Sequence, residues 1–204
     1  MLSAWFRMRT NSSYQPSRIV TTGFGLVELI VSISIMVLIT TVILAKHDSF
    51  NGTSLLRGQA YRIALQTREV QLFAISATDL GNNSFRNVYG LHFNTATPGL
   101  YKVFRDSTNG NNFFDNGEEF GKQGILDKRF EVKAIRLVGG TGPAQTQVSV
   151  SFKRPNFDAR IYTGANTEAN SAVSGVEIDV AVKSTGAIRT IEITKTGQIS
   201  VKDI

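Results

Sequence analysis

The sequence predicts an α+β protein in which one long N-terminal helix precedes a head built from an antiparallel β-sheet. Three features of the 204-residue chain lead to this prediction. An apolar run covers residues 24–45, a stretch with helical spacing fills residues 46–78, and short segments of alternating apolar and polar residues occupy residues 79–204. The helical period of 3.6 and the strand period of 2 distinguish these segments. Residues 1–23 form a separate N-terminal leader.

The apolar run reads FGLVELIVSISIMVLITTVILA from Phe24 to Ala45, and Glu28 is its only charged residue. A helix of this length covers roughly 33 Å, which is about the thickness of the hydrocarbon core of a bilayer. A segment in lipid must be helical to satisfy its own backbone groups, even where β-branched residues are frequent. We therefore predict one membrane-spanning helix.

The positive charges that flank this run are distributed unequally. Arg7, Arg9 and Arg18 precede it without any acid, whereas Lys46 follows it. Loops rich in lysine and arginine stay on the cytoplasmic side of a membrane. The prediction is a cytoplasmic N-terminus, with the remainder of the chain in the periplasm or outside the cell.

Two other interpretations of the run are a secretory signal peptide and a plain single-span anchor. A signal peptide has an apolar core of about 7–15 residues that ends in small residues, and Leu44-Ala45 matches that ending poorly. A plain anchor leaves Glu28 unexplained, because a carboxylate within a span costs on the order of 2.5–3.5 kcal/mol on insertion scales. Snorkelling of Glu28 towards the membrane surface would lower this cost.

The stretch GFGLVE at residues 23–28, followed by the apolar run, resembles the cleavage signal of type IV pilins and type II secretion pseudopilins. The resemblance implies that a prepilin peptidase cuts between Gly23 and Phe24, and that Phe24 is then N-methylated. Glu28 becomes fifth in the mature chain, as in that family. Gly25 stands where the family commonly has threonine, and the run lacks the late proline that kinks the helix of many pilins.

The same resemblance gives Glu28 a role in assembly. Cleavage leaves an ammonium group on Phe24, and Glu28 is the only anion in the run. In the family, this glutamate faces the N-terminus of a neighbouring subunit while the helices pack into a filament. Breaking a buried ion pair costs about 3–5 kcal/mol, so the pair fixes the register of assembly.

The stretch at residues 46–78 has the spacing of an amphipathic helix, with apolar or small residues every three or four positions. We expect this helix to continue the span, to be weakened near Asn51-Gly52, and to lie on the head. The predicted buried face consists of Leu56, Ala60, Ile63, Thr67, Val70, Ala74 and Ala77.

The head is expected to contain short antiparallel strands with one apolar face each, covered on one side. Residues 88–93 and 99–105 predict a hairpin across 94–98. Further strands are expected at 130–138, 147–153, 176–183, 191–193 and 199–201. A helix followed by a sheet is the layout of pilin heads. The closing strands resemble H-type pseudopilins and minor pilins of the fimbrial T type in a general way, whereas the sharp match covers only residues 23–45.

Residues 106–119, DSTNGNNFFDNGEE, concentrate oxygen-bearing side chains on a glycine-containing loop, as hard cations require. We consider this loop a candidate calcium site, although its spacing does not fit an EF-hand. The alternative is a solvated turn. The candidate ligands are Asp106, Asn109, Asn111, Asp115 and Glu118.

The remaining composition favours no enzymatic chemistry. The chain has no cysteine, and its two histidines, His47 and His92, lie far apart in the sequence. His92 is expected to be a packed or surface residue of a strand and not a base. The sequence contains no phosphate-binding loop, no G-x-S-x-G and no metalloprotease helix.

We therefore predict a non-enzymatic pilus or pseudopilus subunit of the inner membrane, whose partners are prepilin peptidase and other pilin subunits. An alternative is an uncut membrane-anchored binding module with a calcium-stiffened loop. A third interpretation is a minor pilin for DNA uptake. DNA ranks last, because the net charge falls from +6 to +3 without the three leader arginines (6 − 3) and no aromatic-interleaved basic stripe is present.

Overall fold

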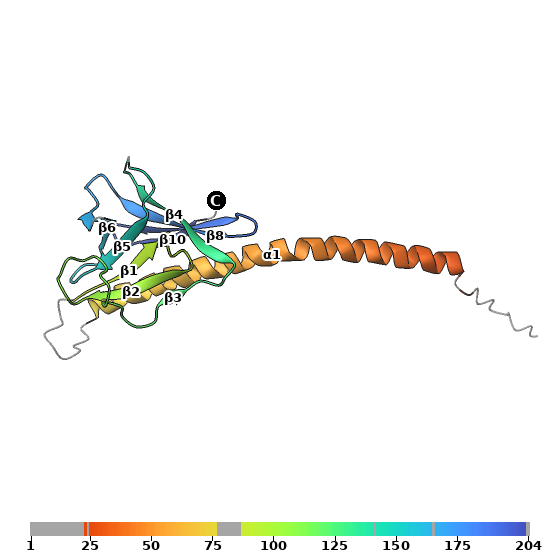
Figure 1. Ribbon diagram of the computed structural model, residues 1–204, viewed down its shortest axis with the longest axis horizontal. Coiled ribbons are helices and arrows are strands. Elements are labelled where there is room, and N and C mark those ends of the chain that lie inside the picture. Colours follow the sequence, from red (N-terminus) through yellow and green to blue (C-terminus); the bar gives the residue numbers. More distant parts are fainter. Residues whose placement is uncertain (1–22, 24, 77–86, 141, 165, 203–204) are drawn as a thin grey trace, which may run out of the picture. The chain divides into compact units, whose positions relative to one another are not determined.

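A computed structural model describes residues 23, 25–76, 87–140, 142–164 and 166–202 (Figure 1). Within these residues the chain forms one α-helix and ten β-strands, and every strand pair is antiparallel. The α+β class is therefore confirmed. The chain divides into two compact units, Met1–Ala45 and Lys46–Ile204.

Helix α1 covers Leu26–Ile75 and is helical through Asn51-Gly52, where we expected a weak join. In the first unit, Leu26–Leu44 is long and apolar enough to cross a membrane, and all of its side chains are exposed. The hydroxyls of Ser34, Thr40 and Thr41 donate to carbonyl oxygens four residues earlier at 2.7–2.8 Å. The helix therefore satisfies these three polar side chains by itself.

In the second unit, α1 packs on the strands through the face that the spacing predicts (Figure 1). Six of the seven residues assigned to that face are at most 3% exposed, and Ala77 lies outside the described residues. The buried residues are Leu56, Ala60, Ile63, Thr67, Val70 and Ala74. Tyr61, Leu65 and Leu72 lie elsewhere on the helix and are 46%, 69% and 55% exposed.

The larger sheet contains six strands in the order β3-β2-β1-β5-β6-β7. Its inner row joins Val103, Leu91, Val150 and Ile161 across four neighbouring strands, and all four side chains are buried. The bounds are β1 Val88–Asn94, β2 Leu100–Asp106, β3 Gly124–Ile125, β5 Gln147–Phe152, β6 Ala159–Thr163 and β7 Thr167–Glu168.

The smaller sheet contains four strands in the order β10-β9-β8-β4. These are β4 Phe130–Val138, β8 Gly175–Val182, β9 Ile188–Thr194 and β10 Ile199–Lys202. Both sheets and α1 contribute to one hydrophobic core. The expected strands are thus present, but the expectation of a single sheet is wrong. The sequence analysis also missed β3, β6 and β7.

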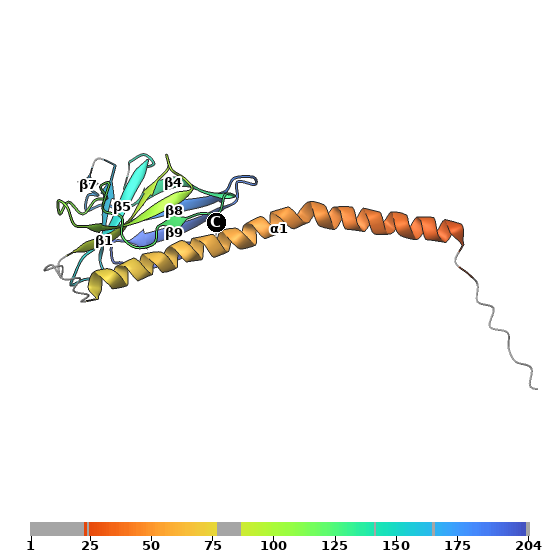
Figure 2. The same cartoon turned by 60° about the horizontal axis from the view of Figure 1, so that its bottom comes forward.

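Figure 2 shows the C-terminal half of α1 running along the strands of the head. Polar contacts fix the last turns of this helix to the loops of the head. The fully buried Gln71 side chain donates to the carbonyl oxygens of Phe157 at 2.8 Å and Gly197 at 3.1 Å. Arg154 donates twice, at 2.8 and 2.7 Å, to the carbonyl oxygen of Ile75, the last residue of α1. A cation at this position satisfies a terminal carbonyl and complements the helix dipole.

Candidate functional site

The predicted cleavage site lies at the boundary of the described residues. Gly23 is described and exposed, whereas Phe24 and residues 1–22 lie outside the described residues. A Cβ placed on Gly23 or on Gly25 would have no heavy-atom contact within 4 Å. The structure of this chain therefore gives no steric reason why residue 23 has to be glycine.

Glu28 lies in the first turn of α1 and is exposed. A negative charge in the first turn of a helix is favourable because the backbone N–H groups there are positively polarised. The described residues offer this carboxylate no hydrogen bond or ion pair of their own. Within Leu26–Leu44, the hydroxyls of Ser34, Thr40 and Thr41 are satisfied inside the helix, and Glu28 is the charged side chain that has no partner among the described residues.

The loop at residues 106–119 is closed by hydrogen bonds from its own amides to its carboxylates. The buried Asp106 accepts the backbone N–H groups of Gly110 and Asn112 at 2.9 and 2.6 Å. The buried Glu118 accepts backbone N–H groups from Thr108 and Asp115, both at 3.1 Å. Asp106 and Glu118 thus act as turn-forming acceptors.

The other three candidate ligands form a second cluster in the same loop. Asp115 Oδ2 accepts side-chain N–H groups from Asn109 at 2.7 Å and Asn111 at 2.8 Å. The structure therefore places all five predicted ligands in one loop, but in two groups. No three His, Cys, Asp or Glu side chains are arranged to hold a metal ion in the part of the chain that the structure describes.

Calcium binding stays a prediction from the sequence. A cation bound only by the folded chain raises the free energy of unfolding, by about 2.7 kcal/mol at a hundredfold excess over the dissociation constant. We expect a higher melting temperature in calcium than in chelator, and magnesium at equal ionic strength is the control. Equal melting temperatures in all three solutions would make the loop a solvated turn.

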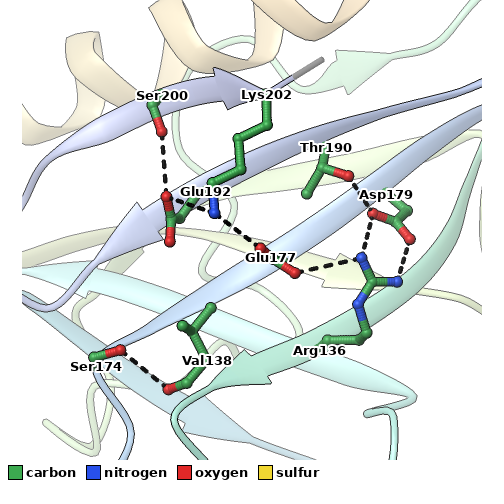
Figure 3. Close-up of polar contacts among 9 residues, drawn as sticks. All are labelled: Arg136, Val138, Ser174, Glu177, Asp179, Thr190, Glu192, Ser200 and Lys202. Carbon is green, nitrogen blue, oxygen red and sulfur yellow. Dashed lines mark hydrogen bonds and ion pairs between the residues drawn. The ribbon is translucent and has the colours of Figure 1, made fainter. Parts of the chain in front are cut away.

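A charged cluster covers the outer face of the four-stranded sheet (Figure 3). Glu177 on β8 and Glu192 on β9 are directly opposite each other, an arrangement of like charges that destabilises a sheet. The ammonium group of Lys202 on β10 lies 3.0 Å from a carboxylate oxygen of each. The hydrogen bond to Glu192, and to a smaller extent the one to Glu177, raises the pKa of Lys202.

Arg136 on β4 completes this cluster by pairing with Asp179 and Glu177 (Figure 3). The Asp179 side chain is only 5% exposed and also accepts the hydroxyl of Thr190 at 2.7 Å. The hydrogen bond to Asp179 raises the pKa of Arg136. Because each charge meets its opposite within the cluster, we interpret it as a device that holds the four strands in register. The sequence shows these charges on separate strands but not which strands are neighbours.

His92 lies on the outer face of the six-stranded sheet, between Lys102 on β2 and Ser149 on β5. It is 7% exposed, in agreement with the predicted packed residue. The rings of Phe113 and Phe114 pack against the imidazole, with centroids 5.5 and 5.0 Å away. Burial, followed by the charge of Lys102, lowers the pKa of His92 to about 4, so the imidazole is neutral at pH 7.

Hydrogen bonding occupies one nitrogen of this imidazole. Ser149 Oγ accepts the backbone N–H of Phe114 at 3.2 Å and lies 2.8 Å from His92 Nδ1. Which of the two atoms donates in this contact depends on the tautomer of the imidazole. In either tautomer Nε2 has no hydrogen-bond partner among the described residues.

The burial of neutral His92 predicts a loss of stability in acid. The unfolded chain binds this proton at about pH 6.5, whereas the folded chain binds it only near pH 4. The free energy of unfolding should therefore fall by about 3 kcal/mol as the pH decreases from 6.5 to 4. Urea unfolding followed by circular dichroism measures this loss. His92→Gln is the control, since the difference between the two proteins removes the contribution of the carboxylates, and parallel curves would contradict the prediction.

Comparisons with protein-family models, with curated proteins and with solved structures found no match to this chain.

Proposed function

We propose that this chain is a structural subunit of a type IV pilus or a type II secretion pseudopilus, processed after Gly23. The observation that carries the proposal is the combination of GFGLVE at residues 23–28 with one apolar helix whose side chains are all exposed. Such a surface requires an apolar environment all around the helix, either lipid or the helices of other subunits.

The polar groups of this helix support assembly through Glu28. The hydroxyls of Ser34, Thr40 and Thr41 donate to the helix's own carbonyls, so these three require no partner from lipid or from another helix. Glu28 has no partner among the described residues, and a carboxylate within a membrane normally has one. The ammonium group that cleavage creates on Phe24 of a neighbouring subunit would supply a cation, which is the partner that this carboxylate needs.

We assign no catalytic step to the head. The histidine and hydroxyl that most resemble a catalytic pair are His92 and Ser149, at 2.8 Å. Ser149 is fully buried, and its Oγ already accepts the N–H of Phe114, so no substrate reaches it. In this proposal the head lies in the periplasm or outside the cell, the span lies in the inner membrane, and the partners are prepilin peptidase and other pilin subunits.

Processing gives the direct test of this function. In a host with prepilin peptidase, the mature protein should begin at Phe24, carry an N-methyl group and lack all three leader arginines. Intact mass and N-terminal sequencing measure this. Gly23→Leu should block cleavage because the enzyme requires a close approach to the backbone, which a side chain prevents.

Gly25→Ala is the matched control, since a Cβ is equally free of contacts at both positions in this chain. It should be cleaved like the native protein. A mature chain that begins at Met1 would instead favour the uncut anchor. A chain that begins after Ala45 would favour a signal peptide, and either result would overturn the proposal.

A further inference from the structure

A cavity of about 280 Å³ lies on the outer face of the six-stranded sheet, beside the packed His92. Strands β1, β2 and β5 form its floor, and the 113–116 segment of the loop forms one wall. Liquid water occupies about 30 Å³ per molecule, so the volume suits a ligand of roughly a dozen covalently linked heavy atoms. The lining residues that matter below are His92, Lys102, Phe113, Phe114, Asp115 and Asn116.

Among the lining residues, His92, Asp115 and Asn116 have polar groups left over after their contacts within the chain are counted. His92 keeps Nε2 for a ligand, because Ser149 occupies Nδ1. Asp115 uses Oδ2 for two asparagine amides, which leaves Oδ1 as an acceptor. The side-chain amide of Asn116 is exposed and has no partner among the described residues, so it offers both a donor and an acceptor.

The positive charge beside the cavity is already compensated. The ammonium group of Lys102 pairs with Glu119 at 2.9 Å and lies 4.5 Å from the centre of the Phe114 ring. The Asp115 carboxylate accepts the two asparagine amides and keeps its negative charge, which a hydroxyl donor can bind. An anionic ligand would therefore find no free cation here, whereas neutral hydroxyl groups can donate to Asp115 and can exchange hydrogen bonds in both directions with Asn116.

We propose that this cavity binds one neutral sugar ring. The hydroxyls of a sugar match the mixture of donors and acceptors on His92, Asp115 and Asn116. Its C–H face matches the apolar wall of Phe113 and Phe114, as expected for a pocket with an apolar lining and a few placed polar groups. The proposal goes beyond filament assembly and does not rest on it, because every residue involved belongs to the unit Lys46–Ile204.

The test is saturation-transfer NMR on the full chain in a zwitterionic detergent, since glucoside and maltoside detergents carry sugars themselves. The probes are D-glucose, D-galactose, D-mannose and N-acetyl-D-glucosamine, with glycine and acetate as charged probes of small size. We expect saturation transfer to at least one sugar and to neither charged probe. Asn116→Ala should weaken that sugar about tenfold or more.

Asn116→Ala suits this purpose because the side chain is exposed and the fold does not depend on it. Asn156→Ala, at an exposed asparagine that does not line the cavity, is the matched control and should bind like the native chain. His92→Gln should also weaken binding, since the Nε2 group is lost. Absence of transfer to all four sugars, binding of glycine or acetate in preference to them, or equal binding by both asparagine variants would each overturn the proposal.

Discussion

Glu28→Leu is expected to enter the membrane at least as well as the native chain and yet to fail to join filaments. The substitution removes the only charge from the span, which favours insertion. It also leaves the N-terminal ammonium group of a neighbouring subunit without its anion. Breaking such a buried pair costs about 3–5 kcal/mol, which corresponds to at least a hundredfold loss of assembled subunit.

Fractionation measures both halves of this expectation, with the membrane fraction reporting insertion and the sheared filament fraction reporting assembly. Val31→Leu, at another exposed position of the same helix, is the control and should assemble normally. Glu28→Asp should restore part of the assembly because it restores the charge. Native levels of Glu28→Leu in filaments would show that the proposed pairing is wrong.

Gly197→Ala is expected to lower the free energy of unfolding of the head by about 3 kcal/mol or more. Gly197 has a φ of 80°, a conformation that an L-residue adopts at a cost of about 1–2 kcal/mol. A Cβ there would also overlap the carbonyl oxygen of Phe157 and lie 2.6 Å from Gln71 Nε2. The substitution should therefore displace the carbonyl oxygen of Phe157, one of the two acceptors through which the Gln71 side chain holds α1.

Gly186→Ala isolates the backbone contribution to this loss. Gly186 has a similar φ of 71°, but a Cβ there would meet no heavy atom within 4 Å. Its cost should stay near the 1–2 kcal/mol of the conformation alone. Urea unfolding of both variants, followed by circular dichroism, measures the difference. Equal losses would show that the contact with Phe157 and Gln71 contributes nothing.

The local features of the fold were predictable because they depend on spacing along the chain. The buried face of α1 follows from residues three and four apart, such as Leu56, Ala60 and Ile63. The hairpin of β1 and β2 follows from two apolar runs joined by a short polar turn. The edge strands β3 and β7 contain two residues each, too few to show any period.

The features that depend on pairing between distant segments were not predictable. Lys202 can bridge Glu177 and Glu192 only because β10, β9 and β8 are neighbours in one register. The cavity requires His92 on β1 to lie under Phe113 of the loop, and no periodicity in the sequence encodes that contact. The five predicted metal ligands share a loop, but their hydrogen bonds within it depend on the turns of its backbone.

The way α1 is held also determines how the head responds to traction. A pull along this helix reaches the sheets through its buried face between Leu56 and Ala74, and through the hydrogen bonds of its Gln66 and Gln71 side chains and of Arg154. Sliding the helix along its axis would have to displace all of these contacts at once, so the load is shared among them in shear. Peeling the helix away sideways would break them one after another at a smaller force. The head therefore resists a pull along the axis of α1 better than a pull across it.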